Sequence, residues 1–119
     1  LARIRAMPLR DAIGEVVDVA FAAYLDNPRL TRAWVRLADV NRLFPVLVRS
    51  QDSIAQQLAA DLAQREDVRV ADRDAAAWLL TNMLMGAVLA AVWDDSPRIV
   101  RDRIRASYIE MAHAYLTAR

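Results

Sequence analysis

The sequence is poor in three residue types that constrain what the protein can be. Its 119 residues include no cysteine, 2 glycines and 4 prolines. Without cysteine the chain has no disulfides, thiolate nucleophiles or zinc–cysteine sites, and it suits a reducing cytoplasm. Scarce glycine and proline leave few positions for tight turns.

Lysine is also absent, because all 16 basic residues are arginines, and 12 of the 15 acidic residues are aspartates. Together with abundant alanine, this usage is typical of GC-rich bacterial genomes, so we expect a bacterial protein. The net charge is +1. Such a balance gives no overall field that would attract nucleic acid or anionic lipid.

The residues that are abundant favour helices. Hydrophobic residues make up 56% of the chain, which is enough for a sizeable core and an additional interface. Alanine, leucine and arginine dominate, and all three are good helix formers. Few β-branched residues stand in alternating runs. We therefore predict an all-α fold in one domain.

Capping residues divide the chain into five predicted helices. Asn27 and Ser96 each stand before a proline, the usual pattern of an N-cap followed by the first helical residue. Pro8 and Asp72 are two further helix starts. Pro45 lies in the first turn of its helix if a nearby residue caps it, and otherwise marks a kink in a longer helix. The predicted helices span residues 9–26, 28–38, 41–66, 73–94 and 97–117.

Residues 75–93 carry no charged side chain, and this length would suffice to cross a membrane. Their composition argues against a membrane span. Many are alanines, and Thr81, Asn82 and Gly86 interrupt the middle of the run. The flanking residues are aspartates, whereas cytoplasmic flanks of spans favour lysine and arginine. We interpret the segment as a buried helix and expect no membrane partner.

The last two predicted helices carry more apolar surface than one small domain can cover. Residues 73–94 are apolar around most of the helix, and residues 97–117 show a broad apolar stripe. We predict a homodimer in which these two helices of each chain form an intersubunit four-helix bundle. Asn82, Gly86 and Ala90 are small enough to let two helix backbones approach closely.

This layout resembles the C-terminal regulatory domain of the TetR family of transcriptional repressors. The resemblance is carried by residues 8–36, PLRDAIGEVVDVAFAAYLDNPRLTRAWVR, and by residues 68–116, VRVADRDAAAWLLTNMLMGAVLAAVWDDSPRIVRDRIRASYIEMAHAYL. In the second stretch an acidic turn precedes an alanine- and leucine-rich helix, and a proline starts the final helix. The matching positions are Asp72, Asp74, Ala76, Ala77, Leu80, Leu84, Gly86 and Pro97.

The resemblance implies a homodimer that binds a small-molecule effector among its regulatory helices. In the family, an N-terminal helix-turn-helix domain reads a palindromic operator, and the effector changes the spacing of the two DNA-binding heads. The present chain begins at Leu1 without methionine, and LARIRAM matches only the tail of the helix that connects the two domains. Operator DNA is therefore an expected partner only through an N-terminal domain that this chain does not contain.

The apolar pattern and the resemblance together suggest two sets of site residues. The expected dimer-interface residues are Leu79, Met83, Gly86, Ala90, Ile104, Tyr108, Met111 and Tyr115. The expected ligand-binding residues are Phe21, Tyr24, Trp34, Leu47, Gln51, Ile54, Leu58, Trp78, Asn82 and Met85. Because the fourth helix carries no charged side chain between Asp74 and Asp94, we expect a neutral or mostly apolar effector. A buried amide needs a hydrogen-bond partner, so Asn82 either pairs across the dimer axis or faces the ligand.

The sequence gives little support for a catalytic site or a metal site. His113 is the only histidine, and Glu110 is its only nearby acidic neighbour. A metal site in a helix bundle normally uses more than one such pair, and no nucleophile–base constellation is visible. We expect no enzyme activity, no metal and no cofactor. The arginines at 98–105 alternate with other residue types and are interpreted as a solvated helix face.

Two functions stay open at this point. The first is an effector-sensing and dimerisation domain, in which the ligand shifts the dimer between DNA-competent and DNA-incompetent geometries. The second is a helical homodimerisation or interaction module with a filled core and no ligand. The aromatic and methionine residues fit either an apolar pocket or plain core packing. A cavity of about 300 Å³ or more would favour the sensor.

Overall fold

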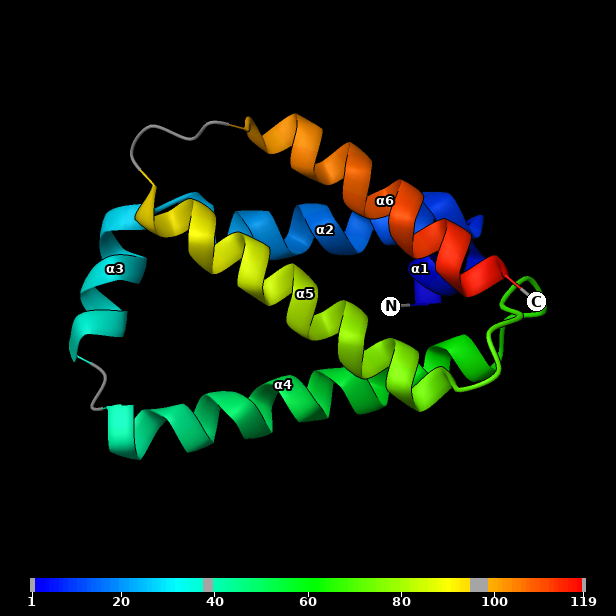
Figure 1. Cartoon of the computed structure of the whole chain (residues 1–119), viewed down its shortest axis with the longest axis horizontal. Helices are drawn as coiled ribbons and strands as arrows, with labels where there is room; N and C mark the ends of the chain where they lie inside the picture. Colours follow the sequence, from blue (N-terminus) through cyan, green and yellow to red (C-terminus); the bar gives the residue numbers. More distant parts are fainter. Residues whose placement is uncertain (1, 38–39, 95–98, 119) are drawn as a thin grey trace.

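The computed structural model describes residues 2–37, 40–94 and 99–118, and these residues form six α-helices and no strand (Figure 1). The all-α prediction is confirmed. The predicted count of five helices is one too few for the described residues. The helices are α1 (Ala2–Ala6), α2 (Leu9–Leu25), α3 (Pro28–Leu37), α4 (Val40–Ala63), α5 (Arg73–Trp93) and α6 (Arg101–Thr117).

The additional helix is α1, at the position where the resemblance implied the tail of a connecting helix. Pro8 separates it from α2, with extended backbone angles of φ −53° and ψ 147°. At the other end of the chain α6 begins at Arg101, later than the predicted residue 97. The predicted start at Ser96 and Pro97 lies outside the described residues.

Two of the predicted caps are confirmed by their hydrogen bonds. At the start of α3 the Leu30 amide donates to Asn27 Oδ1 at 3.1 Å. At the start of α5 the Ala75 amide donates to Asp72 Oδ1 at 3.0 Å. Both side chains satisfy an amide that has no partner within its helix. Pro45 lies inside α4, beyond its first turn, so it is not a first-turn proline, and a kink at Pro45 stays a prediction.

The central element is α5, which packs against α4 on one side and against α2 and α6 on the other (Figure 1). Val17 and Phe21 of α2 fill the core with 0% and 1% of their surface exposed. Small side chains at the contact allow α4 and α5 to lie close together. The buried residues of these two helices are Ala55, Ala59, Leu62, Ala76, Ala77, Leu80, Thr81, Leu84, Val88 and Val92.

Two arginines fix α3 across the C-terminal end of α5. Arg32 Nε donates to the carbonyl oxygen of Val92. The guanidinium group of Arg36 lies over the Trp93 ring, 5.4 Å from its centroid. Cations at this end of a helix complement the helix dipole. These contacts hold α3 in place although few of its side chains are buried.

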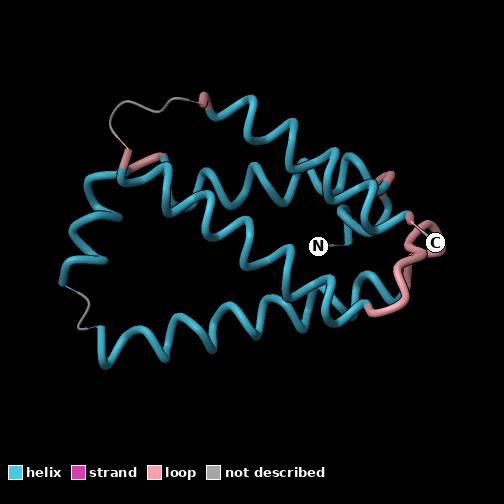
Figure 2. Tube along the Cα trace, viewed as in Figure 1, coloured by secondary structure: helices cyan, strands magenta, loops and turns pink. Residues whose placement is uncertain are grey.

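The last helix is tied to the rest of the fold at both ends. Near its start, Arg105 Nε lies 2.7 Å from Asp18 Oδ1 on α2. Gly14 leaves room for this crossing, because a Cβ there would lie 2.8 Å from Arg105 Nη2. At its end, the amides of Arg69 and Val70 donate to the Leu116 carbonyl at 2.8 and 3.2 Å. The loop of residues 64–72 therefore lies beside the end of α6 (Figure 2).

Candidate functional site

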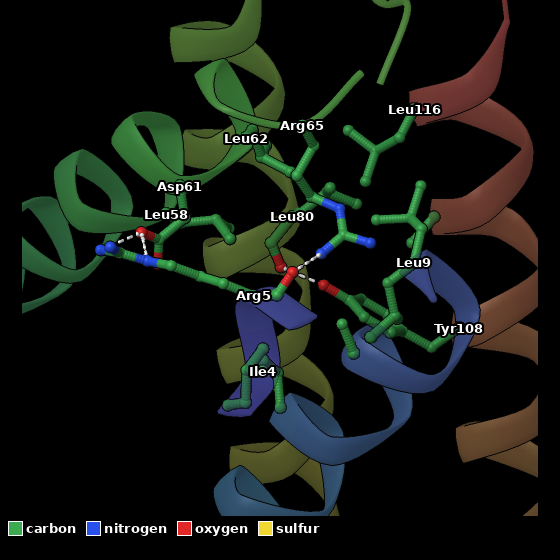
Figure 3. Close-up of a pocket in the computed structure, with 14 residues that line it drawn as sticks. Ile4, Arg5, Leu9, Leu58, Asp61, Leu62, Arg65, Leu80, Tyr108 and Leu116 are labelled. Atoms are coloured by element: carbon green, nitrogen blue, oxygen red, sulfur yellow. Dashed lines mark hydrogen bonds and ion pairs between the residues drawn. The ribbon is translucent and has the colours of Figure 1, made fainter. Parts of the chain in front are cut away.

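An apolar pocket of about 110 Å³ lies where α1, α2, α4, α5 and α6 meet (Figure 3). Most of its wall is aliphatic, and the few polar side chains come from α1, the end of α4 and α6. The short helix α1 contributes Ile4 and Arg5 to the wall. The remaining lining residues are Leu9, Ala12, Ile13, Val16, Leu58, Asp61, Leu62, Arg65, Leu80, Tyr108, Ala112 and Leu116.

Beside this pocket two arginines connect α1 to the end of α4 and to the loop that follows α4. Arg5 Nη2 lies 2.7 Å from Asp61 Oδ1, and the two side chains are 53% and 28% exposed. Arg65 is more buried, with 13% of its side chain exposed. Its Nη2 donates to the Met7 carbonyl at 2.7 Å, and its Nη1 donates to the Arg5 carbonyl at 3.4 Å. Carbonyls at the end of α1 are thus capped by a cation.

Asp67 holds Arg65 in position. Two hydrogen bonds join them, from Nε to Oδ1 at 3.1 Å and from Nη2 to Oδ2 at 3.2 Å. These bonds from Arg65 lower the pKa of the Asp67 carboxyl below its ordinary value. Each arginine at the pocket therefore has a carboxylate partner. Because the charges of these two arginine–carboxylate pairs balance, the pocket favours a neutral ligand over an ion.

Tyr108 provides a hydroxyl group in the pocket wall. The hydroxyl donates to the carbonyl of Leu80 on α5 at 2.7 Å (Figure 3). Burial raises the pKa of this phenol, so the group stays protonated over the whole physiological range. Tyr108 therefore links α6 to α5 and supplies the neutral polar atom of a mostly apolar wall.

The ten predicted ligand-binding residues are spread over the molecule, and Leu58 is the one that lines this pocket. Phe21 is buried in the core, and the Arg101 guanidinium lies over its ring at 4.9 Å. Tyr24 packs against the core from its edge. The Leu47 side chain lies outside the described residues.

The other predicted ligand residues lie nearer the surface. Trp34, Ile54 and Trp78 are 50%, 48% and 52% exposed, and Gln51 and Met85 are half-buried. Asn82 is half-buried as well, and its Nδ2 donates to the Trp78 carbonyl within α5 at 2.9 Å. Its amide therefore has a partner in its own helix. The predicted ligand set stays a prediction.

The predicted dimer face is largely uncovered in the single chain. On α5, Leu79 and Met83 are 43% and 45% exposed, and on α6 Met111 and Tyr115 are each 41% exposed. A Cβ added at Gly86 would meet no atom within 4 Å. Of the other predicted residues, Ala90 is exposed, whereas Ile104 and Tyr108 are half-buried within their own chain.

Helix α5, which carries no charged side chain after Asp74, thus has one buried side and one exposed apolar side. By length and composition alone it could cross a membrane, with 33% of its most apolar stretch buried in the fold. The core helix of a soluble protein passes the same test, so this property by itself is weak evidence. Its cap at Asp72 and its packing against α2, α4 and α6 are those of a helix in a globular bundle.

Charged side chains also surround a groove between α2 and α6. Its volume is about 720 Å³, and it is open to solvent. Arg10, Asp11, Glu15, Arg105 and Glu110 give it both signs of charge. In the described part of the chain no three His, Asp or Glu side chains are grouped to hold a metal. The groove therefore shows no preference for one class of ligand.

Sequence reasoning missed the polar residues of the pocket. Arg5 and Asp61 are 56 positions apart, and Arg65 and Met7 are 58 apart. No local pattern signals such pairs, because they depend on how the loop after α4 returns to α1. The apolar wall was easier to predict from the sequence, because Ile13, Leu62 and Leu80 belong to apolar stripes with helical spacing.

Comparison with known protein families gives a match over most of the chain. The family model described as tetracyclin repressor-like, C-terminal domain, matches residues 8–116, which is most of the chain. No curated protein matches the chain, and no solved structure does.

Proposed function

Because the chain belongs to the tetracyclin repressor-like C-terminal domain family, we propose that it is the effector-sensing and dimerisation domain of a TetR-like transcription regulator. Domains of this family in general serve dimerisation and effector binding, and the regulators that contain them are not enzymes. The match extends the resemblance seen in the sequence to nearly the whole described fold. It leaves open which surface dimerises and which compound binds.

The observation that carries the proposal is the exposed apolar side of α5 together with that of α6. Leu79, Met83, Met111 and Tyr115 all keep more than 40% of their surface accessible. Large exposed apolar side chains on two helices that contact each other are typical of an interaction site on a soluble protein. A two-fold axis across the patch would bury it and would form a bundle of two helices from each chain. We propose a second copy of this chain as the partner, because domains of this family in general dimerise.

The proposed effector is a small neutral molecule that binds in the pocket beneath α1. An apolar wall, a single neutral hydroxyl and two charge-balanced arginines favour such a compound. A ligand shifts the dimer between two geometries only if it binds one of them better. In the regulator, these geometries would differ in the position of the DNA-binding heads that α1 connects to the domain.

A single cysteine tests the proposed face directly, because the chain has no cysteine of its own. Gly86→Cys places a thiol on the exposed side of α5, where the proposal puts close approach of the two helices. Mild oxidation should convert most of this variant to a disulfide-linked dimer. The matched control is Ala22→Cys, which is exposed on α2 and should stay monomeric on a denaturing gel. Equal cross-linking of the two variants would contradict the assigned face.

One observation favours the alternative, an interaction module without a ligand. The pocket volume of about 110 Å³ is below the 300–1,000 Å³ typical of pockets for drug-sized ligands. It is nearer to the ~150 Å³ apolar cavity that is known to take up benzene. Titration with benzene, followed by NMR of the methyl groups of Ile4 and Leu58, separates the two functions. Shifts confined to pocket residues support the sensor, and the absence of shifts supports the module.

A further inference from the structure

We propose that the apolar pocket selects neutral ligands that donate a hydrogen bond, and that the hydroxyl oxygen of Tyr108 accepts this bond. Such ligands carry an O–H or N–H group on an otherwise apolar body, as phenols, alkanols and indoles do. Ligands of similar size that carry only an acceptor, such as nitriles, ketones and ethers, are disfavoured. This inference rests on the proposed effector-binding function. It narrows the effector from neutral compounds in general to those with a hydrogen-bond donor.

The Tyr108 hydroxyl already donates its one proton within the protein. The acceptor is the carbonyl oxygen of Leu80 at 2.7 Å, and burial raises the pKa of the phenol, so the proton stays in place. Figure 3 shows the hydroxyl end of this side chain pointing toward Leu80, among the residues that line the pocket. A phenolic oxygen has one proton to donate but also lone pairs that accept. Tyr108 therefore offers a ligand an acceptor and no donor.

The two arginines of the pocket leave few donors for a ligand. Arg65 makes four hydrogen bonds, two to the carboxylate of Asp67 and two to backbone carbonyls at the end of α1, and a guanidinium group has five N–H donors. Arg5 directs its Nε and Nη2 to Asp61 Oδ1. Figure 3 shows the Arg5 guanidinium beside Asp61 and away from Tyr108. The polar atoms that a ligand meets beside Tyr108 are therefore mainly acceptors.

The direction of the Tyr108 hydrogen bond decides which ligands gain from it. A donor ligand adds a hydrogen bond and leaves the bond to Leu80 in place, and successive bonds through one hydroxyl strengthen each other. For an acceptor-only ligand the hydroxyl must turn away from Leu80, which only exchanges one bond for another. If it does not turn, the polar group of the ligand is buried without a partner, which is costly. The pocket therefore favours donors over acceptors of the same size.

Phenol, benzonitrile and toluene test this preference, because each is one benzene ring with a single small substituent. Phenol donates a hydrogen bond, benzonitrile only accepts one, and toluene does neither. Isothermal titration calorimetry gives their affinities, and shifts of the Ile4 and Leu58 methyl groups locate each probe in the pocket. In the natural chain phenol should bind more tightly than benzonitrile. In Tyr108→Phe phenol should bind about 2- to 12-fold more weakly, the equivalent of one hydrogen bond, whereas benzonitrile and toluene should bind at least as well as before.

The matched control is Tyr24→Phe, which removes the hydroxyl of another half-buried tyrosine that does not line the pocket and should leave all three affinities unchanged. Equal losses for the three probes in Tyr108→Phe would mean that the hydroxyl only supports the shape of the wall. That result, or a natural chain that binds benzonitrile more tightly than phenol, would overturn the donor preference while the pocket function stands. A natural chain that binds none of the three probes would overturn both.

Discussion

The Arg65 guanidinium donates to the carbonyl oxygen of Met7 at 2.7 Å, which joins the loop after α4 to the segment between α1 and α2. The same side chain is bound by Asp67. One arginine therefore ties together α1, α2 and the loop that leads to α5. Since this loop also donates two amides to the end of α6, the contact lies where most of the chain's elements meet.

Arg65→Gln should lower the stability of the fold measurably. The glutamine amide is too short to reach both Met7 and Asp67, so the Met7 carbonyl loses a charged donor. The expected loss is about 1–3 kcal/mol in the free energy of unfolding, measured by urea denaturation. Arg69→Gln is the control, because it makes the same arginine-to-glutamine substitution at an exposed position of the same loop. Equal effects of the two substitutions would show that Arg65 has no special role.

Acid should weaken the clamp between Asp67 and Arg65. The hydrogen bonds from Arg65 hold the pKa of Asp67 below its ordinary value of 3.8. A carboxyl with a lowered pKa stabilises the folded state above pH 3.8, and this contribution is lost as the pH falls through the lowered pKa. The stability difference between the natural chain and Asp67→Asn should therefore be constant near neutral pH and should shrink below about pH 4. Urea titrations from pH 7 to pH 2 measure it, and a constant difference throughout would contradict the assignment.

Tyr108→Phe removes a hydroxyl from the pocket wall. The Leu80 carbonyl keeps its place in the hydrogen-bond ladder of α5, so no buried acceptor is left without a partner. We expect a loss of only about 0.5–1.5 kcal/mol in the free energy of unfolding. The apolar pocket should survive, and benzene should bind at least as well. A loss above 3 kcal/mol would mean that Tyr108 supports far more of the fold than this one bond.

Gly14→Ala should raise the helix propensity of α2 but should disturb the ion pair between Arg105 and Asp18. Alanine is better than glycine inside a helix by about 0.8–1.0 kcal/mol. The new Cβ would meet Arg105 Nη2 at 2.8 Å, but this atom is the movable tip of a long side chain. The exposed pair with Asp18 is worth at most about 1 kcal/mol, so we expect a net gain of about 0.5 kcal/mol. In an Asp18→Asn background the gain should approach the full helix-propensity value. The same Cβ would lie 3.4 Å from Ile109 Cδ1, and destabilisation in that background would indicate a clash with this side chain.

Local signals in the sequence predicted most of the fold. Asn27 and Asp72 marked helix starts because a capping side chain bonds an amide only three residues away. The uncharged run of residues 75–93 predicted a helix packed into the core, and α5 packs against α2, α4 and α6. The start of α6 was placed too early, because Ile99 and Val100 continue the apolar pattern without being helical. The apolar pattern alone does not show at which residue a helix begins.

The pocket was much harder to predict than the helices. Its polar contacts join residues more than 50 positions apart, and they depend on the path of a loop. The spacing of aromatic residues along a helix also did not show toward which part of the molecule their side chains point. Trp34 and Trp78 were expected to line a ligand site, but both are about half exposed. The same spacing fits a pocket, a core or an interface with a second chain.

The central claim is that this domain dimerises through the exposed apolar side of α5 and α6. Sedimentation equilibrium at micromolar concentration measures it most directly, alongside Met83→Arg as a variant of that face. Met83 is 45% exposed, so the substitution should leave the single chain folded. The natural chain should sediment at about twice its mass of 13.4 kDa, and Met83→Arg should sediment at about the mass of one chain. A natural chain that remains monomeric would contradict the claim.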